Sequence, residues 1–243
     1  MNAVQKDMMD RLRQDILLMQ GQRPVTGELS RRVNLGPVLE AFPHKVFPVG
    51  AVHEYLSFEP ANTAATTGFI AGILSSMMLG SGACVWISRQ NNLFPPGFTT
   101  FGLEPHRILF IHLKRDKDIC WATEAALQVA GIAGVVSELP ELDFTASRRL
   151  QLAVEKSGVT GFILREKPRN INSTACVSRW QIAPTASYSQ GVPGVGVPCW
   201  QVDLLKIKGG KPGSWQLKWM NHGFQALTDA SIPIISTPLR KIS

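Results

Sequence analysis

Between residues 50 and 164, short apolar runs alternate with longer stretches of helical periodicity, and this alternation restricts the fold more than any other feature of the chain. The apolar runs are residues 51–57, 83–88, 108–112, 132–137 and 159–164, and helical patterns occupy 63–79, 116–130 and 144–156. The runs are apolar nearly throughout, as in strands that are covered by helices on both faces. The sequence therefore predicts an α/β fold with a parallel core sheet.

After Pro168 the pattern changes from continuous apolar runs to alternation of apolar and polar residues. Three segments alternate in this way: 174–183, 200–208 and 214–220. A loop rich in Pro and Gly separates the first two, and the glycines of 209–213 indicate a turn between the last two. Alternation is typical of antiparallel strands with one solvated face. We expect these strands to extend the parallel sheet.

The domain boundaries follow from where the periodicity begins and ends. Residues 3–20 space apolar side chains as one face of an amphipathic helix does, and Leu12 and Ile16 lie at the centre of that face. We expect an N-terminal helix and connector over 1–48, a core over 49–224 and a loose tail over 225–243. The apolar face of the helix suits either the chain's own core or a partner protein, and Leu12 and Ile16 are candidates for partner contact.

Composition places the chain among globular proteins. Hydrophobic residues make up 44% of the 243 positions, and no run approaches the roughly 18 apolar residues that span a membrane. Charges interrupt the apolar residues of the N-terminus, unlike a secretion signal. The four cysteines show no metal-binding spacing, so we expect reduced thiols and a cytoplasmic location.

The basic excess of the chain lies in its last third. The net charge is +7, and the residues from 165 onward include ten Lys or Arg against three acidic residues, whereas the earlier part is balanced. Such asymmetry favours contact with a polyanion or an acidic partner, although a solvated basic face has the same composition. The candidate contacts with DNA phosphates, which would be non-specific in sequence, are Arg165, Lys167, Arg169, Lys206, Lys208 and Lys211.

The turn after the first predicted strand is where a phosphate-binding loop would lie. Such a loop needs glycines, whose amides wrap the phosphate, and a lysine that neutralises it. The turn here ends in Thr66 and Thr67, where the motif places its hydroxyls, but Ala64 and Ala65 stand in the Gly-Lys positions. The two threonines are therefore candidates for weak nucleotide contact, or for capping the following helix.

Several segments carry a resemblance to a known family. Residues 49–55, 101–112 and 116–127 resemble core segments of the RecA recombinases, and the stretch Phe144-Thr145-Ala146-Ser147-Arg148-Arg149-Leu150-Gln151-Leu152-Ala153 resembles the ImuA-type accessory proteins of bacterial translesion mutagenesis. The resemblance implies a RecA-like P-loop NTPase fold with a degenerate nucleotide loop, its parallel sheet extended by antiparallel C-terminal strands. It also implies a non-catalytic accessory role in damage-induced, error-prone DNA synthesis. The implied partners are ImuB, which is an inactive Y-family-like polymerase subunit, an error-prone DNA polymerase, and RecA.

Departures from the RecA pattern agree with that role. The region after the second strand reads Ser88-Arg89-Gln90, without the glutamate that activates water in RecA, and Glu138 falls near the position of the metal-binding aspartate. We therefore expect little or no ATPase activity and no required cofactor, with weak ATP or Mg²⁺ binding at Thr66, Thr67 and Glu138 left open. The alternatives are an active DNA-dependent ATPase and an inhibitor of the division protein FtsZ of the SulA type.

Two arginines mark a candidate docking surface. Arg148 and Arg149 open the helix predicted over 144–156, whose other side can face the sheet through Leu150, Ala153 and Val154. The exposed side would bind a polymerase subunit or RecA, or would simply be solvated.

Overall fold

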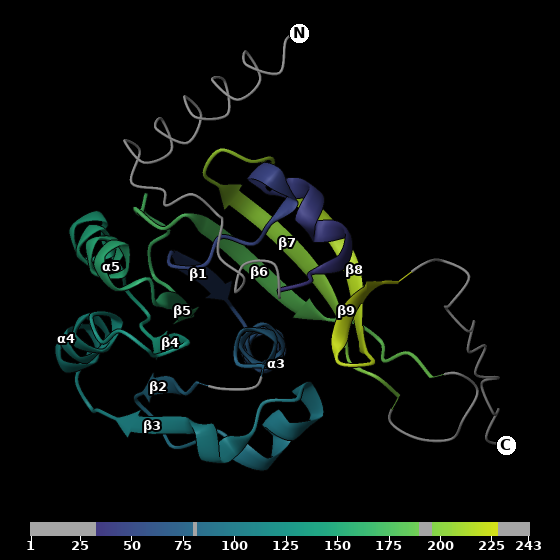
Figure 1. Ribbon diagram of the computed structural model, residues 1–243, viewed down its shortest axis with the longest axis horizontal. Helices are drawn as coiled ribbons and strands as arrows, with labels where there is room; N and C mark the ends of the chain where they lie inside the picture. Colours follow the sequence, from purple (N-terminus) through teal and green to yellow (C-terminus); the bar gives the residue numbers. More distant parts are fainter. Residues whose placement is uncertain (1–32, 80–81, 190–195, 228–243) are drawn as a thin grey trace, which may run out of the picture.

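A computed structural model describes residues 33–79, 82–189 and 196–227, so the predicted N-terminal helix and most of the predicted tail lie outside the described residues. The described chain forms one nine-stranded sheet in the order β3-β2-β4-β5-β1-β6-β7-β8-β9 (Figure 1). The strands are β1 Val52–Ser57, β2 Cys84–Ser88, β3 Ile108–His112, β4 Gly134–Glu138, β5 Thr160–Glu166, β6 Ser178–Pro184, β7 Cys199–Ile207, β8 Gly213–Met220 and β9 Gly223–Ala226.

Parallel pairing joins the first six strands in the sheet order, and antiparallel pairing joins β6 to β7, β7 to β8 and β8 to β9. The prediction of a mixed α/β fold, with a parallel sheet extended by antiparallel C-terminal strands, is confirmed. The helices are α3 Pro60–Met77, α4 Asp116–Leu127 and α5 Phe144–Ser157, with short 3-10 turns η1 Gly36–Ala41, η2 Pro43–Lys45, η3 Pro95–Phe101 and η4 Pro105–Arg107.

The sheet separates two hydrophobic cores. On one face α4 and α5 lie side by side and bury residues such as Ile119 and Leu150 against β1, β2, β4 and β5 (Figure 1). On the other face α3 is enclosed by the sheet and by η3, so that Phe69, Ile70 and Leu74 are fully buried. Helix α3 lacks an amphipathic pattern because protein surrounds it.

Two sequence-based assignments need correction. The segment predicted over 174–183 was expected to be antiparallel, but β6 runs parallel to β1 and is antiparallel only to β7. Buried and less buried residues alternate along β6 because α3 covers one face of the strand. This alternation does not depend on whether the strand runs parallel or antiparallel to its neighbours. Strand β9 was not predicted, because four residues that begin with Gly223 are too short for a periodic signal.

The described residues include no helix that is both long and apolar enough to cross a membrane. All four cysteines are free thiols, and no group of three or more potential metal ligands occurs in the described part of the chain.

Candidate functional site

A cavity of about 420 Å³ lies at the carboxyl ends of the parallel strands, where open α/β sheets bind their ligands. One wall is the start of α3, a second is the segment leading into η3, and the ends of β4 and β5 complete it. The lining residues are Pro60, Thr63, Ala64, Thr67, Gly68, Asn92, Leu93, Phe94, Gly97, Phe98, Phe101, Glu138 and Glu166. The cavity therefore occupies the place where the sequence predicted a degenerate nucleotide loop.

Thr66 and Thr67, both predicted to contact a nucleotide, have different surroundings. Thr67 lines the cavity, whereas Thr66 is fully buried with its Oγ1 atom 3.1 Å from Oγ of Ser57. The hydroxyl of Thr66 therefore forms an internal hydrogen bond and does not reach the cavity. The alternative role as helix caps is wrong, because α3 begins at Pro60 and both threonines lie beyond its first turn.

Glu138 ends β4 and lines the cavity, as its predicted place near a bound nucleotide requires. Its Oε1 atom accepts a hydrogen bond from Nε1 of Trp86 at 3.2 Å. Burial, together with the negative charge of Glu166, raises the pKa of Glu138 from 4.5 to about 7, against the opposing effect of the Trp86 bond. Sequence reasoning did not select Glu166, although its position at the end of a parallel strand was the available signal.

The lining chemistry differs from that of a phosphate site. Its two ionisable side chains are both carboxylates, and it includes neither lysine nor arginine. Pro60 occupies the first turn of α3 and has no N–H to offer to an anion. A bound triphosphate would face two carboxylates and no lysine or arginine among the lining residues, so this site lacks the cationic side chains of a phosphate-binding loop.

Arg165, predicted to contact DNA, has a structural role instead. Its side chain has no exposed surface and pairs with Glu54, Nη1 to Oε1, at 2.6 Å. It also donates to the carbonyl oxygens of Pro140 and Asn170. Arg165 was expected to follow a strand that ended at Leu164, but β5 continues to Glu166 and carries the arginine into the interior. The prediction of a phosphate contact is therefore wrong for this residue.

Glu54 organises a buried network that the sequence analysis missed. Besides Arg165, its carboxylate accepts bonds from Nε of Arg179 at 2.7 Å and from Oγ1 of Thr174 at 2.9 Å. Because the two arginines also bind the carbonyls of Asn170 and Asn172, the network secures the connection between β5 and β6. A glutamate inside an apolar strand was the sequence signal, since a buried charge needs a partner.

The remaining predicted phosphate contacts do not form one patch. Lys206 donates to the carbonyl of Thr174 at 2.8 Å, while Lys167, Arg169, Lys208 and Lys211 are exposed. Lys167 and Arg169 follow β5 at the carboxyl ends of the parallel strands. Strand β7 runs antiparallel to β6, so Lys208 and Lys211, which follow it, lie at the opposite end.

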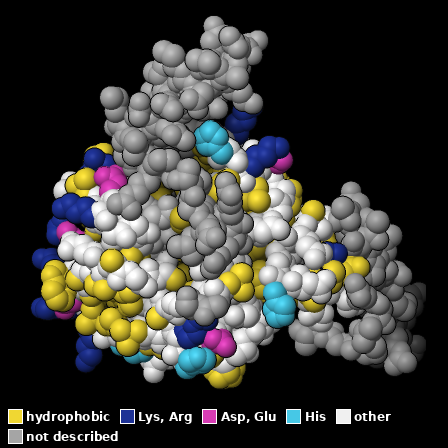
Figure 2. Space-filling view, in the orientation of Figure 1, with side chains coloured by type: hydrophobic (Ala, Val, Ile, Leu, Met, Phe, Trp, Pro, Cys, Tyr) yellow, Lys and Arg dark blue, Asp and Glu magenta, His cyan; other side chains and the backbone are white. Residues whose placement is uncertain are grey.

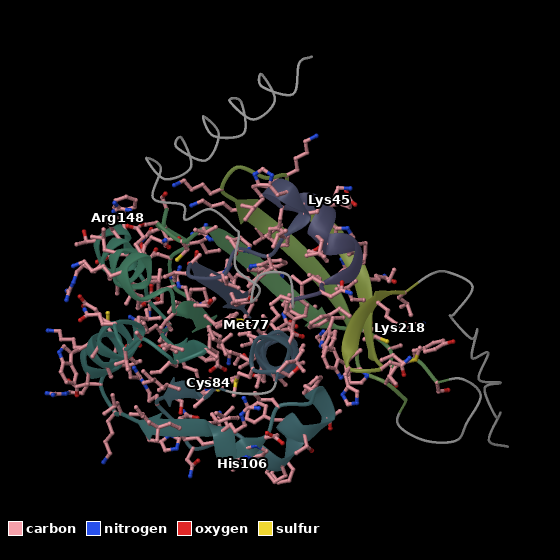
Figure 3. The ribbon with its side chains drawn as sticks, viewed as in Figure 1. Lys45, Met77, Cys84, His106, Arg148 and Lys218 are labelled. Atoms are coloured by element: carbon pink, nitrogen blue, oxygen red, sulfur yellow. The ribbon has the colours of Figure 1, made fainter. Side chains whose placement is uncertain are left out.

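Arg148 and Arg149 of α5 are both exposed, as predicted, and Figure 3 shows Arg148 on the outer side of the helix. Arg149 forms an ion pair with Glu124 of α4, and Arg148 lies 3.6 Å from Glu155. The side chains expected to face the sheet (Leu150, Ala153 and Val154) are buried. Leu12 and Ile16, the other candidates for partner contact, lie outside the described residues.

The surface around these arginines contains apolar groups that the sequence analysis did not select. Trp121 of α4 is 69% exposed and Leu152 of α5 is 42% exposed. Figure 2 shows hydrophobic side chains gathered over α4, with Lys and Arg along their margin. A groove between the helices is lined by Glu124, Gln128, Ala130, Arg149, Leu152, Ala153, Lys156 and Ser157. The available signal was a tryptophan on the polar face of the helix predicted over 116–130.

Comparison with known proteins identifies a family. No family model matches the chain. Two curated proteins named Protein ImuA, from two strains of Caulobacter vibrioides, are each 34% identical to it over 198 residues, which cover 75% of this chain and 80% of theirs. This similarity includes most of both sequences, and the chain therefore belongs to the ImuA family.

Proposed function

We propose that the protein is a non-catalytic accessory factor of damage-induced, error-prone translesion DNA synthesis. The observation that carries the proposal is the 34% identity to Protein ImuA. The cavity at the strand ends supports the non-catalytic part, because its two carboxylates and its lack of lysine and arginine are unsuited to ATP.

The surface of α4 and α5 is the part of the molecule best suited to hold a partner. Exposed tryptophan and arginine side chains are enriched among residues that dominate protein interfaces, and Trp121 lies on the helix next to Arg148 and Arg149. We place a polymerase subunit of the ImuB type on this surface. An error-prone polymerase and RecA are the other candidate partners.

The test is affinity purification of the tagged full-length protein from DNA-damaged cells, followed by mass spectrometry. We expect wild type to recover a Y-family-like polymerase subunit, an error-prone polymerase or RecA. A Trp121→Ala, Arg149→Ala variant should recover at least tenfold less of it. Leu205→Ala is the matched control, because Leu205 is a comparably exposed apolar residue on β7, in the antiparallel part of the sheet.

Other outcomes would reject the proposal. Recovery of FtsZ with inhibition of its GTPase would indicate a division inhibitor of the SulA type. Recovery of no DNA-repair protein would indicate that this chain has no role in mutagenesis. Equal recovery by wild type and the double variant would reject the α4–α5 surface as the binding site, but would leave the proposed accessory role intact.

A further inference from the structure

The cavity at the strand ends has two chemically distinct walls. Leu93, Phe94, Phe98 and Phe101 provide an apolar wall, and the ring of Phe94 is 73% exposed at its margin. Glu138 and Glu166, at the ends of β4 and β5, provide the charged part of the cavity. A large exposed aromatic ring beside a concave site is a common element of ligand recognition.

The two carboxylates have the same orientation relative to the sheet. Glu138 pairs with Leu164 in the register of β4 and β5, so Glu166 lies two residues beyond it and on the same face. Within the described ranges, neither carboxylate forms an ion pair with a lysine or arginine. This contrasts with Glu54 on the other face, whose charge is balanced by two arginines.

The charge of Glu138 is therefore uncompensated in a partly buried position. Burial and the proximity of Glu166 both favour its protonated form and raise its pKa to about 7. A positively charged group placed between the two glutamates would reverse this effect, because an opposite charge within a few ångströms stabilises both carboxylates. The two carboxylates therefore favour a cation over an anion in this cavity.

We infer that this cavity is a receptor for a cationic side chain, a guanidinium or ammonium group on an apolar stem. The charged end would bind between Glu138 and Glu166, and the stem would pack along Phe94 and Phe98. A volume of about 420 Å³ is ample for one arginine or lysine side chain. The inference goes beyond the proposed function and does not depend on it.

The cationic side chain can come from a partner protein or from basic residues of this chain outside the described ranges, such as Arg240 and Lys241. Both sources present the same chemistry. Replacing Arg240 and Lys241 in the full-length chain distinguishes them, because an occupant from the chain itself would compete with an added ligand.

The experiment is an NMR titration of the full-length protein with N-acetyl-arginine methylamide. The reporter is the indole N–H of Trp86, which donates to Glu138 and can be assigned from a Trp86→Phe variant. The capped citrulline analogue has the same shape without the charge and is the matched ligand control. We expect a saturable shift with the arginine compound at pH 8, none with citrulline, and about tenfold weaker binding at pH 6, where Glu138 is mostly protonated.

Three variants locate the site. Glu138→Gln and Glu166→Gln should each weaken binding about tenfold, since each removes one charge from the receptor. Glu104→Gln, an exposed carboxylate next to η4, should leave the affinity unchanged. Tighter binding by an Arg240→Gln, Lys241→Gln variant than by wild type would identify these two residues as the occupant, and equal binding would exclude them.

The inference is overturned if the arginine compound shifts Trp86 in neither wild type nor the Arg240→Gln, Lys241→Gln variant. It is equally overturned if citrulline binds as well as arginine, if Glu138→Gln leaves the affinity unchanged, or if Mg²⁺-ATP saturates the site instead. Circular dichroism of each variant confirms that a loss of binding reflects lost charge and not unfolding.

Discussion

At the scale of single residues, two glutamates in apolar strands illustrate how neighbours decide a side chain's role. Glu54 is fully buried, but Arg165, Arg179 and Thr174 satisfy its carboxylate. Glu138 is less buried, yet its hydrogen-bond partner is a single neutral indole. Glu54 therefore holds the fold together through its two buried ion pairs, whereas the pKa of Glu138 is raised to about 7 and its charge changes near neutral pH.

The first prediction concerns stability and pH. Because the pKa of Glu138 is raised from 4.5 to about 7, the stability that its protonated form contributes is complete below pH 4.5 and is lost as the pH rises through 7. Glu138→Gln should match wild type at pH 4 and exceed its free energy of unfolding by about 2–3 kcal/mol at pH 8. Urea denaturation at pH 4 and pH 8 measures the free energy of unfolding of both proteins. The same difference between them at the two pH values would contradict the prediction.

The second prediction concerns the buried network. Glu54→Gln removes the buried carboxylate that pairs with both Arg165 and Arg179, and breaking a buried pair in this way costs about 3–5 kcal/mol. Glu40→Gln is the matched control, because the pair between Glu40 and Lys45 is exposed and contributes at most about 1 kcal/mol. If thermal or urea unfolding gave equal losses for both variants, the Glu54 network would have no special role in stability.

At the scale of elements, the sequence located most strands and helices because continuous apolar runs and helical periodicity are local signals. Other features depend on distant residues. The interior position of Arg165 depends on Glu54, which is 111 positions away, so the arginine was assigned to a surface loop. The burial of Phe42 and Phe47 against Trp180 and His53 likewise had no local signal. The cavity's location followed from the strand order, whereas its aromatic wall required the three-dimensional structure.

The packing between α3 and the antiparallel strands gives the third prediction. A Cβ atom at Gly72 would approach side-chain carbons of Phe224 and Trp219 to 2.8 Å. Gly72→Ala should therefore lower the free energy of unfolding by about 1–3 kcal/mol, despite the better helix propensity of alanine. Gly223→Ala is the control, since no atom lies within 4 Å of its added Cβ. Equal stability of the two variants would show that the side chains of β8 and β9 move aside for the added methyl group at little cost in free energy.

At the scale of the whole molecule, the basic residues of the last third are distributed over two ends of the sheet. Lys167 and Arg169 lie at the carboxyl ends of the parallel strands, and Lys208 and Lys211 lie at the amino ends. Six-residue strands separate the ends by about 20 Å. A basic composition therefore does not produce one basic surface in the described part of this protein.

The fourth prediction follows for DNA. A duplex that binds at one end of the sheet should contact only the pair at that end, so replacing that pair with alanine should reduce the slope of log affinity against log salt by about 2. Replacing the other pair should leave the slope unchanged. Fluorescence anisotropy over a range of salt concentrations measures both slopes. Equal reductions from both pairs would mean that the bound DNA contacts both ends of the sheet.

The fifth prediction is that the protein has no ATPase activity. Purified protein with Mg²⁺-ATP and single-stranded DNA should release no more phosphate than a buffer control, because the cavity lacks a cation to stabilise the transferring phosphoryl group. DNA-stimulated turnover that is abolished by Glu138→Ala would contradict both this prediction and the proposed non-catalytic role.

The position of β1 in the middle of the sheet has a consequence for biosynthesis. Val52 pairs with Gly161 of β5, and His53 pairs with Ser178 of β6, so both neighbours of β1 are made more than a hundred residues later. While the ribosome synthesises the intervening residues, both edges of the apolar strand β1 remain unpaired. Unpaired strand edges promote aggregation. Nascent chains that end before Glu166 should therefore depend on chaperones, because neither neighbour of β1 is complete at that point.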